Sequence, residues 1–266
     1  MAGSLCGVWV DDAGHVHTTI ETEGGGRAEQ RATLRPFAWL GAGAENTAAT
    51  AGLTIEALAG EGPFGRLTHA EEIGAFTEFV RATREGASVD VIRPLENQFL
   101  LQQRVRLYGD MAFGKVRRCQ LDIEVASPDG GFPDATRAED RVLAVGLRVG
   151  GRNQLLLLEA MTDAAEKKLL EDFGVALVAA DPDVIEGHNI FKFDLDYLRQ
   201  RCRRHKVACA WGRYGQRASF RNSKLKVAER WIDFSRCDLP GRAVVDTYLL
   251  VQLFDITTRE MTSYGL

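Results

Sequence analysis

The chain has 266 residues, enough for one large or two ordinary domains, and 45% of them are hydrophobic, which excludes global disorder. A formal net charge of −4 argues against a protein that coats nucleic acid over its whole surface. No apolar run approaches the roughly 20 residues that cross a bilayer, and the start lacks a signal-peptide pattern, so no membrane partner is expected. Five scattered cysteines, with no Cys-x-x-Cys pair, argue against zinc and indicate a reducing, cytoplasmic compartment.

The first part, residues 1–117, is predicted to be a smaller mixed α/β domain without a catalytic cluster. Its hydrophobic periodicity and its Gly, Pro and Asp breaks predict strands at 5–10, 15–21, 31–40, 52–58 and 89–92, a surface loop at 42–51, and helices at 69–84 and 96–108.

The second part, residues 118–266, is organised around a strand predicted at 119–126. Apolar and acidic residues alternate from Gln120 to Val125, so Asp122 and Glu124 lie on one face of this strand. Neighbouring carboxylates repel each other, and a divalent cation such as Mg²⁺ or Mn²⁺, which prefers oxygen ligands, relieves that repulsion. The simpler alternative is an edge strand whose two acids are only solvated.

Regular elements continue after the Pro- and Gly-rich loop at 127–140. The pattern predicts strands at 141–149, 153–159 and 184–187, a helix over 163–179 that Thr162 caps, and a helix over 192–206. These elements predict an α/β (α+β) fold with a mixed central sheet and flanking helices.

Asp194 lies in the first turn of the last of these helices. The helix dipole favours an acid there, so helix stabilisation is one explanation. A carboxylate at a strand-to-helix junction also projects over the carboxyl edge of a sheet. Asp122, Glu124 and Asp194 together are the minimum set that could hold two metal ions.

The segment from Arg199 to Arg230 is strongly basic, with eleven Lys or Arg residues and a single acid, Glu229. Such a block favours a polyanionic partner, although a solvated helix face followed by a loop explains the charge equally well.

Three segments resemble motifs of family B DNA polymerases. Leu121-Asp122-Ile123-Glu124 is similar to the first motif, Asp-x-Glu, of the DEDD proofreading exonucleases. Asn189-Ile190-Phe191-Lys192-Phe193-Asp194 is similar to the second, Asn-x-x-x-Phe-Asp. Gly241-Arg242-Ala243-Val244-Val245-Asp246 resembles a segment that follows in the same family. The stretches Arg35–Trp39 and Arg93–Leu101 also resemble the family, most closely bacterial enzymes of the DNA polymerase II type.

The resemblance implies an N-terminal domain followed by a ribonuclease H-like 3′–5′ exonuclease domain at 118–266. The family's third motif, Tyr-x-x-x-Asp, is not found before Leu266, so we expect an N-terminal segment of a longer polymerase whose other domains follow in cis. Without a fourth carboxylate, the segment itself is expected to be a weak or inactive nuclease.

The resemblance also implies roles for the site residues, in two-metal hydrolysis at the 3′ end of DNA. Asp122 would bridge two Mg²⁺ or Mn²⁺ ions, Glu124 would hold the nucleophile's metal and Asp194 the other. Asn189 and Phe193 would shape the pocket for the terminal nucleotides, although Phe193 could equally be a core residue. Contacts with DNA phosphates are expected from Arg199, Arg203, Arg217, Arg221, Lys224 and Lys226, partly on a hairpin at 217–230.

Asp246 admits two interpretations: a helix cap, or an accessory acid near the metals. His188 is expected to be a structural hydrogen-bonding residue. Two alternatives to a proofreading exonuclease remain open, namely a non-catalytic DNA-binding module of a polymerase and a free-standing DEDD ribonuclease.

Overall fold

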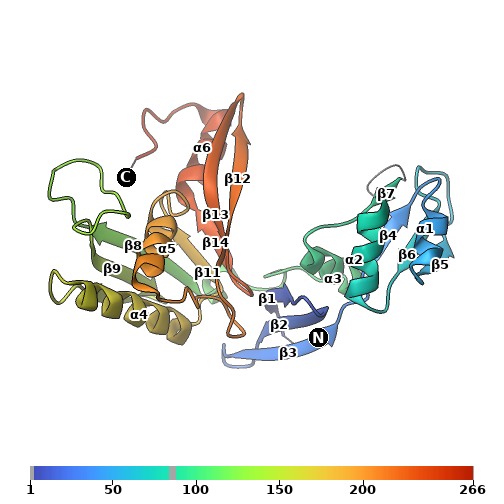
Figure 1. The fold of residues 1–266 in the computed structure, drawn as a ribbon, viewed down its shortest axis with the longest axis horizontal. Helices are drawn as coiled ribbons and strands as arrows, with labels where there is room; N and C mark the ends of the chain where they lie inside the picture. The colour runs from blue at the N-terminus through green and yellow to red at the C-terminus, as the bar shows by residue number, and fades with distance from the viewer. Residues whose placement is uncertain (1–2, 84–87, 266) are drawn as a thin grey trace. The chain divides into compact units, whose positions relative to one another are not determined.

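The computed structural model describes residues 3–83 and 88–265 and divides them between two compact units, Met1–Asp110 and Met111–Leu266. The predicted domain boundary after residue 117 falls inside the second unit. Figure 1 shows the elements of each unit. Among the helices of the described ranges, none has the length and apolar character that crossing a bilayer requires.

The first unit contains two antiparallel sheets. One has the order β1-β2-β3, with β1 (Leu5–Val10), β2 (His15–Glu21) and β3 (Arg27–Thr33). The other has the order β5-β6-β4-β7, with β4 (Phe37–Leu40), β5 (Thr54–Ala57), β6 (Arg66–His69) and β7 (Val89–Asp90). The helices of the unit are α1 (Glu45–Thr50), α2 (Ile73–Ala82) and α3 (Leu95–Gln103). Helix α3 ties the sheets together, because Glu96 accepts a hydrogen bond from the N–H of Val10 and Gln98 accepts one from the N–H of Phe37.

Several predictions for the first unit were wrong in detail. The strand predicted at 31–40 is two strands in different sheets, because Pro36 lacks the N–H that a continuous ladder needs. The loop predicted at 42–51 contains α1, since alanine is the strongest helix former and Ala48 packs into the core. Strand β6 was not predicted. The helix predicted at 69–84 begins later, at Ile73, and its last predicted residue lies outside the described residues.

The second unit is built on a mixed five-stranded sheet with the order β10-β9-β8-β11-β14. Its strands are β8 (Arg118–Val125), β9 (Val142–Val149), β10 (Arg152–Leu157), β11 (Val184–Gly187) and β14 (Ala243–Asp246), and the last two run parallel to β8. Its helices are the short η2 (Phe113–Lys115), α4 (Asp163–Ala180), α5 (Asp194–His205) and α6 (Thr247–Thr258). The predicted mixed sheet with flanking helices is confirmed.

A two-stranded hairpin separates α5 from β14. Strands β12 (Ser219–Val227) and β13 (Arg230–Asp238) pair over their whole length, with the turn at Ala228 and Glu229. The hairpin predicted at 217–230 is therefore present but longer, because the prediction covered only the first strand and the turn.

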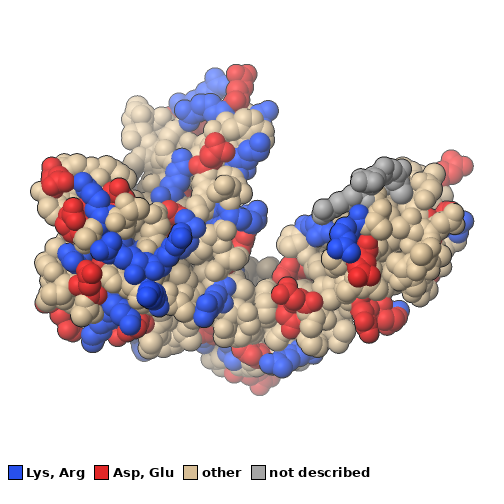
Figure 2. Space-filling view, viewed as in Figure 1, with Lys and Arg blue, Asp and Glu red and all other residues tan. Residues whose placement is uncertain are grey.

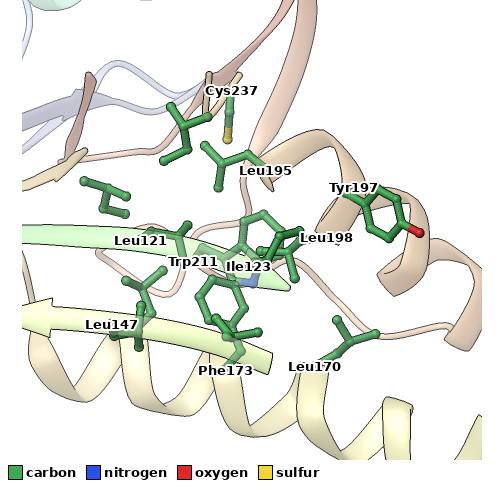
Figure 3. Close-up of a cluster of buried hydrophobic side chains, with 14 of the residues drawn as sticks. Leu121, Ile123, Leu147, Leu170, Phe173, Leu195, Tyr197, Leu198, Trp211 and Cys237 are labelled. Atoms are coloured by element: carbon green, nitrogen blue, oxygen red, sulfur yellow. The ribbon is translucent and has the colours of Figure 1, made fainter. Parts of the chain in front are cut away.

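The core of the second unit lies between the sheet and helices α4 and α5. The alternation on β8 buries Leu121 and Ile123, and Figure 3 shows them beside Phe173, Leu198 and Trp211. The same alternation leaves the acidic residues of β8 exposed on the opposite side of the strand. The packing of a few leucine and aromatic side chains thus fixes the direction in which the candidate site residues point.

Candidate active site

Part of the exposed face of β8 lines a hollow in the second unit. Asp122 and Glu124 are both exposed, as the alternation predicts. Asp122 lines a hollow of about 500 Å³, together with Arg148 from β9, Asn153 from β10 and Glu186 from β11. Glu124 and Asp194 do not line this hollow. The hollow therefore gives solvent and small solutes access to the Asp122 carboxylate.

A tight turn brings the second acidic segment next to β8. Strand β11 ends at Gly187, where a Cβ atom would lie 2.8 Å from the carbonyl oxygen of Leu121, so only glycine allows the two strands to approach this closely. Asn189 follows with φ of 63°, a left-handed conformation that asparagine tolerates better than most residues. Its carbonyl accepts hydrogen bonds from the N–H groups of Lys192 and Phe193, and α5 begins at the next residue, Asp194.

Asp194 is joined directly to the acidic strand. Its Oδ1 accepts a hydrogen bond of 3.1 Å from the backbone N–H of Ile123, the residue between Asp122 and Glu124. The carboxyl group is buried, with 2% of the residue exposed. Burial raises the pKa of Asp194 to about 7, and the negative charges of Asp122 and Asp246 add to the effect, against the hydrogen bonds from its own N–H and from Ile123. This carboxyl group is therefore held in a place that disfavours its ionised form.

The carboxylate oxygens of Asp122, Glu124 and Asp194 are suitable ligands for a hard cation, but the three groups do not converge on one metal position. Among the described residues, none of the three takes part in an ion pair with Lys, Arg or His: Arg118 pairs with Glu186, and Arg199 pairs with Asp196. Oxygen donors without a cationic partner suit Mg²⁺ or Mn²⁺. Within residues 3–83 and 88–265, however, no three Asp, Glu, His or Cys side chains converge closely enough to hold a metal ion.

Asp246 caps the N-terminus of α6 and also holds the turn that precedes α5. Its carboxylate accepts hydrogen bonds from the N–H groups of Tyr248 and Leu249 at the start of α6, and from those of Asn189 and Phe191 in the preceding turn. Four backbone donors occupy the buried carboxylate, so the geometry favours the helix-cap interpretation over an accessory acid. His188 hydrogen-bonds Thr247 and the carbonyl of Tyr264, in keeping with a structural residue.

Phe193 is half-buried and has an aromatic neighbour that the sequence did not reveal. Phe132, in the loop after β8, is 82% exposed, and its ring centroid lies 5.9 Å from that of Phe193 in an edge-to-face arrangement. The available signal in the sequence was a phenylalanine placed between the glycines and the proline of the loop at 127–140. The pair forms an aromatic wall beside the N-terminus of α5.

The basic segment is not one continuous surface. Arg201 is fully buried against Glu166, and Arg213 is buried against Asp181 and Asp183. Arg199 is half-buried, bonds Asp196 and lies 4.9 Å from the centroid of the Phe220 ring. Of the six cations predicted to contact DNA, five are exposed: Arg203, Arg217, Arg221, Lys224 and Lys226. Figure 2 shows Lys and Arg side chains gathered over α5 and along the hairpin.

The hairpin carries an exposed aromatic ring close to two cations. Trp231 is 56% exposed on β13, and the ammonium groups of Lys224 and Lys226 lie 4.8 and 5.9 Å from the centroid of its ring. Both lysines come from β12, and Lys226 pairs directly with Trp231 across the hairpin. Arg221 is partly neutralised by Asp238, at 2.6 Å.

The match that decides the family covers the whole of this unit and the last residues of the first. A family model described as "DNA polymerase family B, exonuclease domain" matches residues 102–266. The chain belongs to DNA polymerase family B. The polymerase-type exonuclease motifs expected from the sequence thus lie in a domain that the comparison assigns to the same family.

Relatives and a solved structure agree with this assignment. The chain is 25% identical over 160 residues to the DNA polymerase of Archaeoglobus fulgidus, covering 60% of this chain and 18% of that protein. It is 35% identical over 132 residues to DNA polymerase 2 of Aeropyrum pernix, covering 50% and 16%. The structure of the family B DNA polymerase from Pyrobaculum calidifontis superposes with a TM-score of 0.63 over 93% of this chain and 37% of that one; at 20% identity this likeness shows the fold alone. The chain therefore spans less than a fifth of the length of these two curated relatives.

Proposed function

We propose that the second unit is the 3′–5′ exonuclease domain of a family B DNA polymerase and removes nucleotides from the 3′ end of DNA during template-directed synthesis. The hydrogen bond between Ile123 and Asp194 carries the proposal, because it joins the two acidic motifs at one place on the sheet. We further propose a bacterial polymerase of the DNA polymerase II type, acting in the cytoplasm with its remaining polymerase domains in cis; the relatives named above are archaeal, so this rests on the sequence resemblance.

Exonuclease domains of this family generally depend on divalent metal ions. Asp122, Glu124 and Asp194 are the residues that would hold Mg²⁺ or Mn²⁺. When bound, the ions supply a nucleophilic water and stabilise the leaving 3′ oxygen. The chain's own contribution is to present the carboxylates on a rigid strand and a helix terminus, with Asp246 bracing the turn that carries Asn189.

The remaining candidate residues would bind and orient the DNA strand. Phe193 and Phe132 offer ring faces and edges beside Asp194, where a terminal base could stack. The exposed cations Arg203, Arg217, Arg221, Lys224 and Lys226, with the partly engaged Arg199, would contact phosphates without reading sequence. Trp231, at the hairpin, would add stacking to these charges.

Asp122→Ala in the intact polymerase tests the proposal. We expect release of nucleotides from a 3′-labelled DNA strand to fall by at least about 100-fold while primer extension is retained, since a metal ligand contributes several kcal/mol to the transition state. Asp172→Asn, which removes an exposed carboxylate of α4, is the matched control and should leave both activities unchanged.

Unchanged nucleotide release in Asp122→Ala would contradict the proposal. It would favour the non-catalytic DNA-binding module of a polymerase. Faster release from RNA than from DNA would instead favour the ribonuclease.

A further inference from the structure

A wide groove opens between the C-terminal half of α4 and the adjoining end of the sheet. This α4 groove has a volume of about 920 Å³, and all the residues that line it belong to the second unit. Side chains of β9 and β10 form its floor, and α4 forms one wall. Asp122, Glu124 and Asp194 do not line it, so the α4 groove is not part of the candidate active site.

Small side chains on α4 leave this space unfilled. The first half of the helix packs leucine and phenylalanine side chains into the core, whereas the part that borders the groove presents Ala176, Ala179 and Ala180. An alanine methyl group is too short to fill the space between a helix and a sheet. The floor opposite is also aliphatic, with Leu147, Val149 and Leu156.

Positive charges gather at one end of the α4 groove. Lys115, Arg117 and Arg118 lie where the chain enters β8, and Arg152 begins β10. The two groups meet at the same end of the sheet, because β8 and β10 both pair with Val149 of β9 there. The groove therefore combines an aliphatic body with a cationic end.

The α4 groove carries little negative charge of its own. The one acid among the described residues that line it is Asp172, and its carboxylate accepts a hydrogen bond of 2.6 Å from Lys168. Arg117 and Arg118 are paired with acids outside the groove, at 3.7 and 3.4 Å. Four cations against one acid that is already paired leave the lining with an excess of positive charge.

We propose that the α4 groove binds a segment of a partner protein in which aliphatic residues are followed by acids. The aliphatic side chains pack on the floor and against α4, and the acidic end reaches Lys115 and Arg152, which are both exposed. Val175, in the same wall, is 71% exposed and is covered by the partner. An apolar centre with a charged rim is the common composition of protein–protein contacts.

Two other ligand classes match the α4 groove less well. Bases of single-stranded DNA stack on aromatic rings, and an aliphatic floor offers none, so the strand leaves the apolar lining uncovered. A fatty acid has an aliphatic body and an anionic end, but a groove as open as this one leaves much of a single acyl chain in water. A peptide covers the open side with its own backbone.

Fluorescence anisotropy with a labelled peptide of three leucines followed by four glutamates tests the site on the 266-residue chain. We expect saturable binding that weakens at least about 10-fold in Ala179→Trp, because the indole fills the groove. Ala179 is exposed, so this change does not disturb the core. Val178→Trp is the matched control, since Val178 is the exposed neighbour on α4 that does not line the groove, and it should keep the affinity.

The cationic end is tested by Lys115→Glu with Arg152→Glu. Reversal of both charges should weaken the peptide at least about 10-fold and remove most of the salt dependence of binding. Lys167→Glu with Lys206→Glu makes the same change in net charge at exposed positions outside the groove and should leave binding unchanged. Thermal unfolding of each variant verifies that it is folded.

The peptide itself supplies the remaining measurements. Replacement of its leucines by serine, or of its glutamates by lysine, should each abolish binding. No binding of the original peptide up to about 1 mM would overturn the proposal, and so would wild-type affinity in Ala179→Trp. Tighter binding of sodium oleate or of a DNA single strand, lost in Ala179→Trp, would assign the groove to that ligand instead and equally overturn it.

Discussion

The backbone N–H of Ile123 donates a 3.1 Å hydrogen bond to Oδ1 of Asp194, and so joins the middle of β8 to the first turn of α5. Ile123 points into the core with 5% of its surface exposed, so this attachment point is rigid. The bond fixes a buried acid next to a strand that carries two more. Such an arrangement costs folding free energy and is the kind that functional sites retain.

Asp194→Asn should stabilise the metal-free protein at pH 8 and have little effect near pH 4. The pKa of Asp194 is raised from 3.8 to about 7 in the folded state, so the folded protein holds this proton more tightly than the unfolded chain does. Stability is therefore lost as pH rises from about 4 to 7, by about 1.4 kcal/mol per unit of pKa shift. Urea unfolding with a chelator present, across this pH range, measures the difference.

The control for this prediction is Asp172→Asn, because Asp172 is an exposed acid paired with Lys168. It should show no gain that grows with pH. A constant difference between Asp194→Asn and the wild type at every pH would mean that the ionisation of Asp194 carries no folding penalty.

The buried face of the second unit was the most predictable part of the structure. Strict alternation around Leu121 and Ile123 predicted both the strand and the exposed face of Asp122 and Glu124, since a one-residue slip would expose the core side chains. The contact between β8 and α5 was not predictable from local pattern, because it joins residues 71 positions apart. The family resemblance supplied that link.

Long-range ion pairs explain where the charge analysis failed. Arg201 and Arg213 were counted in the basic segment at 199–230. Each is in fact buried and ion-paired with an acid that lies more than 29 positions away in sequence. Nothing local distinguishes them from the exposed Arg203. The short helix α1 was missed for a different reason, since the Ala- and Gly-rich stretch at 42–51 that contains it also suits a loop.

Arg201→Met should destabilise the protein by about 3–5 kcal/mol, because it leaves Glu166 as a buried charge whose one remaining ion-pair partner among the described residues is His205. Arg201 also donates to the carbonyls of Ala135 and Arg137, so the loop after β8 loses its anchor. Denaturant unfolding near neutral pH measures the loss.

The double variant Arg201→Met with Glu166→Met should recover a large part of that stability. Replacing both partners removes the uncompensated charge and leaves an apolar contact. If the double variant were as unstable as the sum of the two single variants, the ion pair would not be the cause.

Asp246→Ala should cost about 1–3 kcal/mol and loosen the turn that carries Asn189. The carboxylate serves two elements at once, with donors from the start of α6 and from the turn before α5. Hydrogen exchange of the Asn189 and Phe191 amides should accelerate in the variant. Protection of these amides at the wild-type level would show that the brace is dispensable.

The lysines and the tryptophan of the hairpin should affect DNA binding in different ways. In the double variant Lys224→Gln with Lys226→Gln, the plot of log affinity against log salt concentration should become less steep. Its slope should change by about 0.7 for each phosphate that the variant no longer neutralises. Trp231→Ala should weaken single-strand binding by about 1–3 kcal/mol without changing that slope. Fluorescence anisotropy with a labelled single strand at several salt concentrations separates the two effects.

Lys167→Gln with Lys168→Gln removes the same charge from α4 and serves as the matched control. It should leave both the affinity and the slope unchanged. If the slope became less steep by the same amount in this control, the hairpin lysines would contribute no more to DNA binding than the lysines of α4.

The binding of Mn²⁺ to the 266-residue chain, measured by electron paramagnetic resonance, tests most directly whether Asp122, Glu124 and Asp194 form a metal site. We predict that a single Mn²⁺ ion binds weakly, and that it binds more tightly at pH 8 than at pH 6 because Asp194 must ionise. Binding should be lost in Asp122→Asn and in Asp194→Asn, and it should be kept in Asp172→Asn. Wild-type Mn²⁺ affinity in Asp122→Asn and Asp194→Asn would contradict the account.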